Sequence, residues 1–177
     1  MNPSHPTSAP TVLRPAPPTD ADIHTARTGV DSPVGRLAVE ATEEAIIAVH
    51  WIDDAAAIAP AGPGLLQEAA RQLDAYFARR LTTFDLPLAP AGSPFERDIW
   101  RLMCDIPYGD TMTYGEMADA VGGAARAVGY ACGSNPIPVI IPCHRVLGAG
   151  NRMVGYSGRG RVETKRWLLV HEGKLLL

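Results

Sequence analysis

The chain has 177 residues, enough for one domain of ordinary size or two small ones, and 46% of them are hydrophobic, so it can bury a substantial core. Its longest apolar run, 45–52, is far shorter than the ~20 residues of a membrane-spanning helix, which argues against an integral membrane protein. A formal net charge of -3 is unusual for a protein that binds nucleic acid, yet the charge is unevenly spread. Residues 1–88 hold 6 basic and 11 acidic side chains, whereas residues 120–177 hold 8 basic and 2 acidic ones, so the carboxy-terminal third is a positive pole.

Residues 1–27 are predicted to form a flexible tail. Six of the first 18 residues are proline and there is no apolar run, so this segment can bury too little surface to offset the entropy of ordering it. It also lacks the hydrophobic segment of a signal peptide. Three cysteines, an odd number, favour reduced thiols over a disulfide framework, so we expect a cytoplasmic protein.

Residues 28–90 are predicted to form a small α/β domain. The segments 34–41 and 44–52 are rich in Val, Ile and Ala and predict two strands of a hairpin. Apolar residues recur at helical spacing over 64–80, which indicates a helix lying on that sheet. Residues 83–88 are a candidate edge strand, and several prolines near residue 90 mark a linker.

Residues 91–177 are predicted to form an all-helical domain. Capping boxes at 93–96 and 113–116 open two helices, and a glycine turn separates the second from a helix over 124–133. Two short helices across such a turn predict a helix-turn-helix, whose second helix enters a DNA groove, although an ordinary helical hairpin has the same pattern. A last helix is expected at about 162–172.

The dipeptide Cys143-His144 is the candidate reactive centre, and it follows an apolar, proline-interrupted run that predicts a strand. A thiol reacts as its thiolate, which a neighbouring imidazole can help to form. A cysteine in apolar surroundings is more often an inert core residue, and we expect Cys104 and Cys132 to be of that kind. The cysteines show no paired ligand spacing with histidine, so no metal site is expected.

The surroundings of this dipeptide carry further motifs. In chain order they are ARAVGYACGSNP at 125–136, PCHRV at 142–146, GYSG at 155–158 and WLLVHEG at 167–173. With these motifs the chain resembles the O6-alkylguanine-DNA alkyltransferases over residues 93–173, and residues 31–35 are a weaker match to the amino-terminal domain of that family. The resemblance implies an α+β fold, with a small ribonuclease-H-like α/β domain followed by a helical domain that contains a winged helix-turn-helix.

The resemblance also implies a reaction. Cys143 would accept the alkyl group of O6-alkylguanine irreversibly, without a cofactor, while His144 takes the thiol proton through a bridging water and Glu172 orients the imidazole. Asn135 would tie the second helix of the hairpin to the Cys143-His144 turn. Tyr114 would help to rotate the nucleotide and then protonate the guanine.

DNA carrying an alkylated base is the implied partner, bound by a monomer. The O6 atom of guanine lies inside the base stack, so the nucleotide must be rotated out into a pocket. Arg126, with Ala125 beside it and Tyr114, would contact the DNA, and Arg126 would fill the space that the base leaves. The base pocket would be lined by Pro138, Val146, Tyr156, Ser157 and Gly158. O4-alkylthymine is a second candidate adduct.

Three other functions fit parts of the sequence. A non-catalytic, alkyltransferase-like protein that binds the lesion and recruits repair factors typically lacks the cysteine, which is present here with His144 and Glu172. A helix-turn-helix regulator leaves PCHRV unexplained and would need an effector domain. A cysteine hydrolase could use Cys, His and Glu, but its nucleophile and base would be adjacent in sequence.

Overall fold

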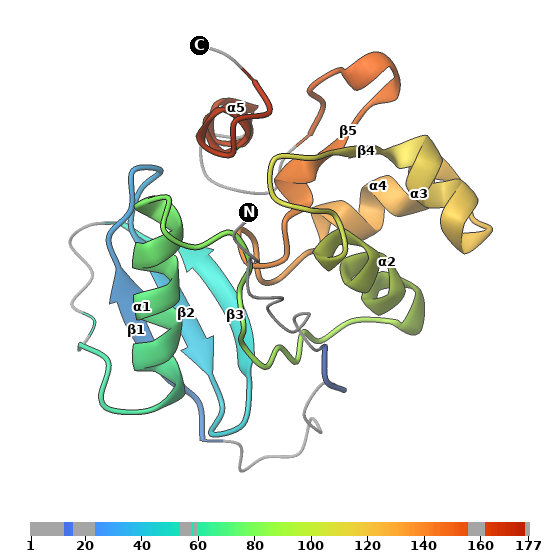
Figure 1. Cartoon of the computed structure of the whole chain (residues 1–177). Coiled ribbons are helices and arrows are strands. Elements are labelled where there is room, and N and C mark those ends of the chain that lie inside the picture. Colours follow the sequence, from blue (N-terminus) through green and yellow to red (C-terminus); the bar gives the residue numbers. More distant parts are fainter. Residues whose placement is uncertain (1–12, 16–23, 54–57, 59, 156–161, 176–177) are drawn as a thin grey trace, which may run out of the picture.

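The computed structural model of the protein describes residues 13–15, 24–53, 58, 60–155 and 162–175 (Figure 1). Among these, the amino-terminal part is a three-stranded sheet with one helix, and the carboxy-terminal part is mainly helical. The α+β fold expected from the sequence is confirmed. Buried hydrophobic residues of both parts form one continuous core.

The sheet is antiparallel with the strand order β1-β2-β3, comprising β1 (Ala26–Val30), β2 (Leu37–Ala41) and β3 (Ile46–Trp51). The hairpin β2–β3 agrees with the sequence prediction, whereas β1 begins two residues before the expected start of the domain. The expected edge strand at 83–88 is not formed, and only Leu88 in it makes isolated bridges, to Leu13 and Ile46. Pro87 has no N–H to donate to a strand ladder, which explains the difference.

Helix α1 (Leu65–Phe77) covers one face of this sheet (Figure 1). Its Leu73 and Tyr76 are completely buried, and they lie three positions apart on the face that meets the rest of the molecule. The helix therefore forms as its apolar spacing predicts.

The carboxy-terminal helices are α2 (Pro94–Cys104), α3 (Tyr114–Val121), α4 (Ala125–Gly133) and α5 (Val162–His171). Both predicted capping boxes are formed. In the first, the Ser93 hydroxyl accepts from the Glu96 N–H at 3.3 Å, and the Glu96 carboxylate accepts from the Ser93 N–H at 2.8 Å. Gly122 ends α3 in the left-handed conformation, so the chain reverses into α4 as the glycine turn predicts.

The carboxy-terminal part also contains a strand pair, so it is not all-helical. Strands β4 (Met112–Thr113) and β5 (Val146–Leu147) pair in parallel and join the start of α3 to the segment after Cys143. The strand expected before Cys143 is absent: residues 136–142 contain only an isolated bridge, and Cys143–Arg145 is a single 3-10 turn, η1. Three prolines in 136–142 lack the N–H that a ladder requires.

The two parts of the molecule meet through polar contacts as well as through the core. The Val49 N–H of β3 donates to the Pro136 carbonyl at 2.9 Å, just before the segment that leads to Cys143. The Tyr76 hydroxyl of α1 donates to Oε1 of Glu172 at 2.7 Å. Among the described residues, no helix has the length and apolar character needed to cross a membrane.

Candidate active site

Four residues with reactive or ionisable side chains are buried in and around η1. Cys143, His144, Arg145 and Glu172 are 4%, 0%, 6% and 5% exposed. The first three follow one another in η1, and Glu172 comes directly after the last residue of α5. Ionisable groups at this depth need partners, so their hydrogen bonds define what the site can do.

The His144 ring is fixed by Glu172. His144 Nε2 lies 2.8 Å from Oε1 of Glu172, and an ionised carboxylate can only accept, so Nε2 carries the proton. The other ring nitrogen, Nδ1, is buried and has no hydrogen-bond partner among the described residues. Burial lowers the pKa of His144 despite the opposing effect of Glu172, so at neutral pH Nδ1 is an unprotonated base.

Glu172 accepts hydrogen bonds from three further groups. Arg145 donates from Nε to Oε2 at 2.9 Å and from Nη2 to Oε1 at 3.0 Å, and the Gly109 N–H donates to Oε2 at 3.2 Å. The Tyr76 hydroxyl is the third donor. Burial by itself raises the pKa of Glu172, but the hydrogen bond from His144 and the hydrogen bonds and charge of Arg145 outweigh burial and hold that pKa well below its usual value. Glu172 therefore remains a carboxylate.

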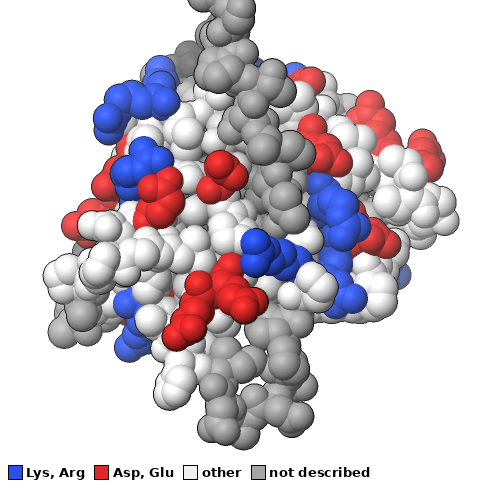
Figure 2. Space-filling view, turned by 60° about the horizontal axis from the view of Figure 1, so that its bottom comes forward, with Lys and Arg blue, Asp and Glu red and all other residues white. Residues whose placement is uncertain are grey.

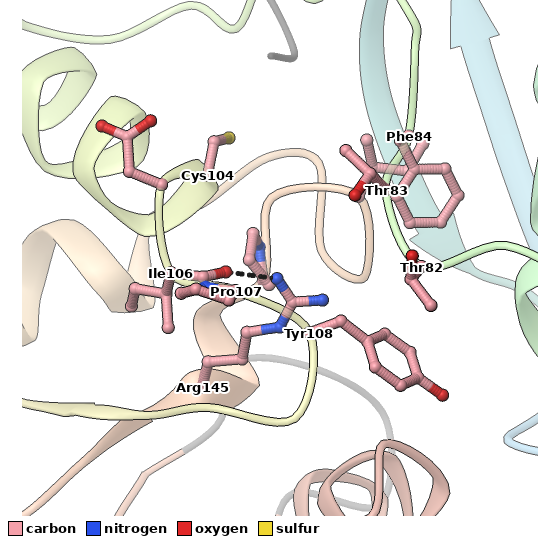
Figure 3. A pocket seen from close by; sticks show the side chains of 11 residues that line it. Thr82, Thr83, Phe84, Cys104, Ile106, Pro107, Tyr108 and Arg145 are labelled. Atoms are coloured by element: carbon pink, nitrogen blue, oxygen red, sulfur yellow. Dashed lines mark hydrogen bonds between the residues drawn. The ribbon is translucent and has the colours of Figure 1, made fainter. Parts of the chain in front are cut away.

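Arg145 also contacts the loop between α2 and β4. Its Nη1 donates to the Ile106 carbonyl at 2.6 Å, and its guanidinium lies 5.9 Å from the centre of the Tyr108 ring. Figure 3 shows these groups on the wall of a pocket that is also lined by Thr82, Thr83 and Phe84. Of the residues expected to form the base pocket, Pro138 and Val146 belong to the described part of the chain, and neither lines this pocket.

Asn135 lies between α4 and the Cys143-His144 turn. Its Nδ2 donates to the Ile141 carbonyl at 2.9 Å, and its Oδ1 accepts from the Ile137 N–H at 3.0 Å. Between them, Val139 has a φ of 74°, which is rare for a β-branched residue. The buried Asn135 side chain thus holds together a strained segment that ends at the candidate nucleophile.

Tyr114 is the first residue of α3 and directly follows β4. The partner strand of β4 is β5, which directly follows the turn that contains Cys143 and His144. The Tyr114 hydroxyl donates to the Val154 carbonyl at 3.4 Å, and burial raises its pKa to about 12, so it stays protonated at neutral pH. Pro138 and Val146 are buried, and they lie five residues before and three residues after Cys143 in the sequence. Of the expected pocket residues, Tyr156, Ser157 and Gly158 lie outside the described residues.

Ala125 and Arg126 are exposed in the first turn of α4. No side chain caps this helix. The Arg126 guanidinium lies 5.8 Å from the centre of the Tyr130 ring, and Tyr130 is 68% exposed. Tyr130 was not among the residues singled out from the sequence, because an aromatic residue in an amphipathic helix is usually a core residue.

Several residues of the site escaped the sequence analysis. Lys165 is completely buried, and its Nζ donates to the Val146 carbonyl at 2.6 Å and to those of Val154 and Gly155 at 3.2 Å. Arg145 and Lys165 are two of the 8 basic residues in 120–177 and both are buried, so the positive pole is weaker at the surface than its composition suggests. On the face in Figure 2, acidic and basic side chains are interspersed. Arg145 could have been found from its place in PCHRV, whereas no local signal marks Tyr76, Gly109 or Lys165.

The other two cysteines lie in α2 and α4. Burial raises the pKa of Cys104 and of Cys132 to about 12, so both are thiols at neutral pH. No disulfide links the three cysteines. Within the described ranges, no group of three or more His, Cys, Asp or Glu residues is arranged to hold a metal ion.

The chain matches two family models that together span most of its length. Residues 94–174 match the DNA-binding domain of 6-O-methylguanine DNA methyltransferase, and residues 26–90 match the ribonuclease-like domain. The chain is 42% identical over 149 residues to the methylated-DNA--protein-cysteine methyltransferase of Mycolicibacterium paratuberculosis, covering 81% of this chain and 89% of that one. This chain belongs to the 6-O-methylguanine DNA methyltransferase family.

Other family members agree in sequence and structure. The methylated-DNA--protein-cysteine methyltransferase of Shigella flexneri is 49% identical over 123 residues, covering 68% of this chain and 69% of that one. The crystal structure of Mycobacterium tuberculosis O6-methylguanine methyltransferase superposes with a TM-score of 0.75 at 37% identity, covering 86% and 96% of the two chains. A structure of the M. tuberculosis protein in complex with DNA gives a TM-score of 0.73 at 39% identity, covering 86% and 94%.

Proposed function

We propose that this protein repairs O6-alkylguanine in double-stranded DNA by moving the alkyl group to its own Cys143. The observation that carries the proposal is the buried Cys143-His144 pair, in which Glu172 holds Nε2 of the imidazole and leaves Nδ1 as a base. Relatives that cover most of this chain are named methylated-DNA--protein-cysteine methyltransferases. A lesion-binding protein without catalysis would not need this arrangement.

The proposed chemistry is a nucleophilic displacement. Nδ1 of His144 takes the thiol proton, directly or through water, and Glu172 stabilises the resulting imidazolium. The Cys143 thiolate attacks the alkyl carbon, a sulfur–carbon bond forms, and the bond from that carbon to O6 breaks with its electron pair staying on the guanine. Tyr114, which burial keeps protonated, supplies a proton to the departing guanine. A thioether is a poor leaving group, so each molecule reacts once.

The proposed DNA contacts lie on α4 and at the start of α3. Exposed backbone N–H groups at the uncapped start of α4 suit a phosphate, and Arg126 is placed there to enter the duplex as the base leaves. Tyr114 would assist the rotation of the nucleotide. The pocket is proposed to consist of Pro138, Val146, Tyr156, Ser157 and Gly158, and O4-alkylthymine is its second candidate adduct.

We also propose that the protein acts as a monomer in the cytoplasm. A pair of domains at 28–90 and 91–177, preceded by a tail at 1–27, remains our proposed division of the chain. The match of the two family models to 26–90 and 94–174 supports a boundary near residue 90.

Intact-mass analysis tests the function directly. After incubation with duplex DNA carrying O6-methylguanine, the protein should gain one methyl group, located on Cys143 by peptide mapping. Cys143→Ser should gain none while still binding DNA, because an alcohol is far less acidic than a thiol. Cys104→Ser is the matched control and should be methylated like the wild type. Repeated turnover, or methylation of the Cys143→Ser variant, would show that the assignment is wrong.

A further inference from the structure

Tyr76 connects the amino-terminal domain to the candidate catalytic carboxylate. It lies in α1, 96 residues before Glu172 in sequence, and its side chain is completely buried. Its hydroxyl donates to Oε1 of Glu172 at 2.7 Å, the same oxygen that lies 2.8 Å from Nε2 of His144. A residue outside the DNA-binding domain thus shares an acceptor atom with the candidate base.

The position of the hydroxyl is fixed by packing around the Tyr76 ring. The ring contacts Phe77, Phe84, Tyr108 and His171, with ring centres 5.1 to 6.1 Å apart. The Tyr76 carbonyl also accepts a hydrogen bond from Nε2 of His171 at 2.8 Å, and His171 directly precedes Glu172 in the chain. Two separate bonds therefore tie this one residue of α1 to the end of α5.

We propose that Tyr76 is a positioning residue for alkyl transfer, which holds Oε1 of Glu172 in place and limits how strongly that oxygen attracts the proton of His144. The inference rests on the proposed function of Cys143, His144 and Glu172. Burial raises the pKa of Tyr76, so its hydroxyl keeps its proton and acts only as a donor to the carboxylate. A donor to Oε1 reduces the negative charge that His144 meets.

Other charged groups face the same atoms and must stay unchanged in a test. Arg145 of η1 donates to both oxygens of Glu172, and Tyr108 and the Gly109 N–H face it from the loop before β4. The charge of Lys165 in α5 also lowers the pKa of His144. Because these groups remain in Tyr76→Phe, that variant removes one donor from an otherwise intact set.

The experiment compares Tyr76→Phe with the control Tyr108→Phe. Both substitutions keep an aromatic ring and remove one hydroxyl, but the Tyr108 hydroxyl donates to the His171 carbonyl at 3.1 Å rather than to Glu172. The pKa of the His144 ring is measured by NMR in each folded protein, and the rate of methyl transfer from duplex DNA is measured between pH 5 and 9. Circular dichroism and DNA affinity establish that each variant is folded.

In Tyr76→Phe we expect the pKa of His144 to rise by about half a unit or more, because Glu172 loses a neutralising donor. The acid limb of the rate profile should move to higher pH by the same amount, so that the transfer rate on that limb falls about 3-fold or more at a given pH, with unchanged DNA affinity. Tyr108→Phe should leave the His144 pKa and the limb at their wild-type positions.

An unchanged pKa of His144 in folded Tyr76→Phe overturns the inference, and so does an equal shift in Tyr108→Phe. The NMR titration does not depend on alkyl transfer, so it decides the role of Tyr76 even if the protein is inactive. Failure of the proposed function has a different signature, which is the absence of methyl transfer by the wild-type protein itself.

Discussion

Glu172 is a buried charge at the carbonyl end of a helix, where the helix dipole opposes a negative group. Its stability there depends on donors, of which Arg145 is the only full charge in direct contact among the described residues. A buried pair of this kind adds little compared with a hydrophobic replacement, but removing one partner leaves an uncompensated charge. The pair is therefore explained by what Glu172 does for His144 rather than by stability.

Arg145→Ala should lower the free energy of unfolding by about 3–5 kcal/mol, because it leaves Glu172 buried without its cationic partner. Urea unfolding at pH 7 measures the loss. The control is Arg101→Ala, which breaks an exposed ion pair with Asp98 at 2.8 Å and should cost less than about 1 kcal/mol. Similar losses in the two variants would mean that the Arg145–Glu172 pair is screened like a surface pair.

At the scale of elements, the sequence predicted the features that depend on local chemistry. Both capping boxes, the glycine turn and the apolar spacing of α1 lie within a few residues of the elements they specify. The two-residue strands β4 and β5 are too short for any periodic signal. The apolar run before Cys143 does not form the expected strand because its prolines cannot donate to a strand ladder. The dipeptide pointed to Cys143 and His144 and the resemblance to a family pointed to Glu172, but no motif spans the 96 residues that separate Tyr76 from Glu172.

The loop between α2 and β4 approaches the site so closely that it requires a glycine. Gly109 has a φ of 78°, and a Cβ atom there would lie 2.8 Å from the Glu172 carbonyl oxygen. Gly109→Ala should cost about 1–3 kcal/mol in unfolding free energy and also slow methyl transfer, because the loop must move away from Glu172.

Gly122→Ala is the control for that substitution. It has a similar φ of 65° but no atom within 4 Å of the added methyl group, so it carries the conformational cost alone and should leave the transfer rate unchanged. An undiminished transfer rate in Gly109→Ala would show that the loop does not position Glu172.

For the whole molecule, the buried side chains of His144 and Glu172 make stability depend on pH. Burial lowers the pKa of His144, so below about pH 6.5 the unfolded chain binds a proton that the folded chain does not, and stability falls. The pKa of Glu172 is also lowered, so its contribution is present above its unfolded value of 4.5 and is lost as the pH falls below it.

The midpoint of urea unfolding should therefore decrease from pH 7.5 to 5.5. The contribution of His144 to the free energy of unfolding should fall by at most about 1.4 kcal/mol per pH unit. His144→Gln removes this titrating group while keeping a donor for Glu172, and it should flatten the profile over the same interval. A wild-type midpoint that does not change between these pH values would contradict the neutral, buried state of His144.

The burial of Cys143 also bears on chemical selectivity inside a cell. A thiol that can be used only once is wasted by every adventitious electrophile or oxidant that reaches it, whereas a recycling enzyme loses only time to such encounters. At 4% exposure, Cys143 presents little of its surface to reagents in bulk water, so we expect them to react with it slowly. The same packing that makes the nucleophile hard to reach reserves each copy of the protein for a DNA lesion.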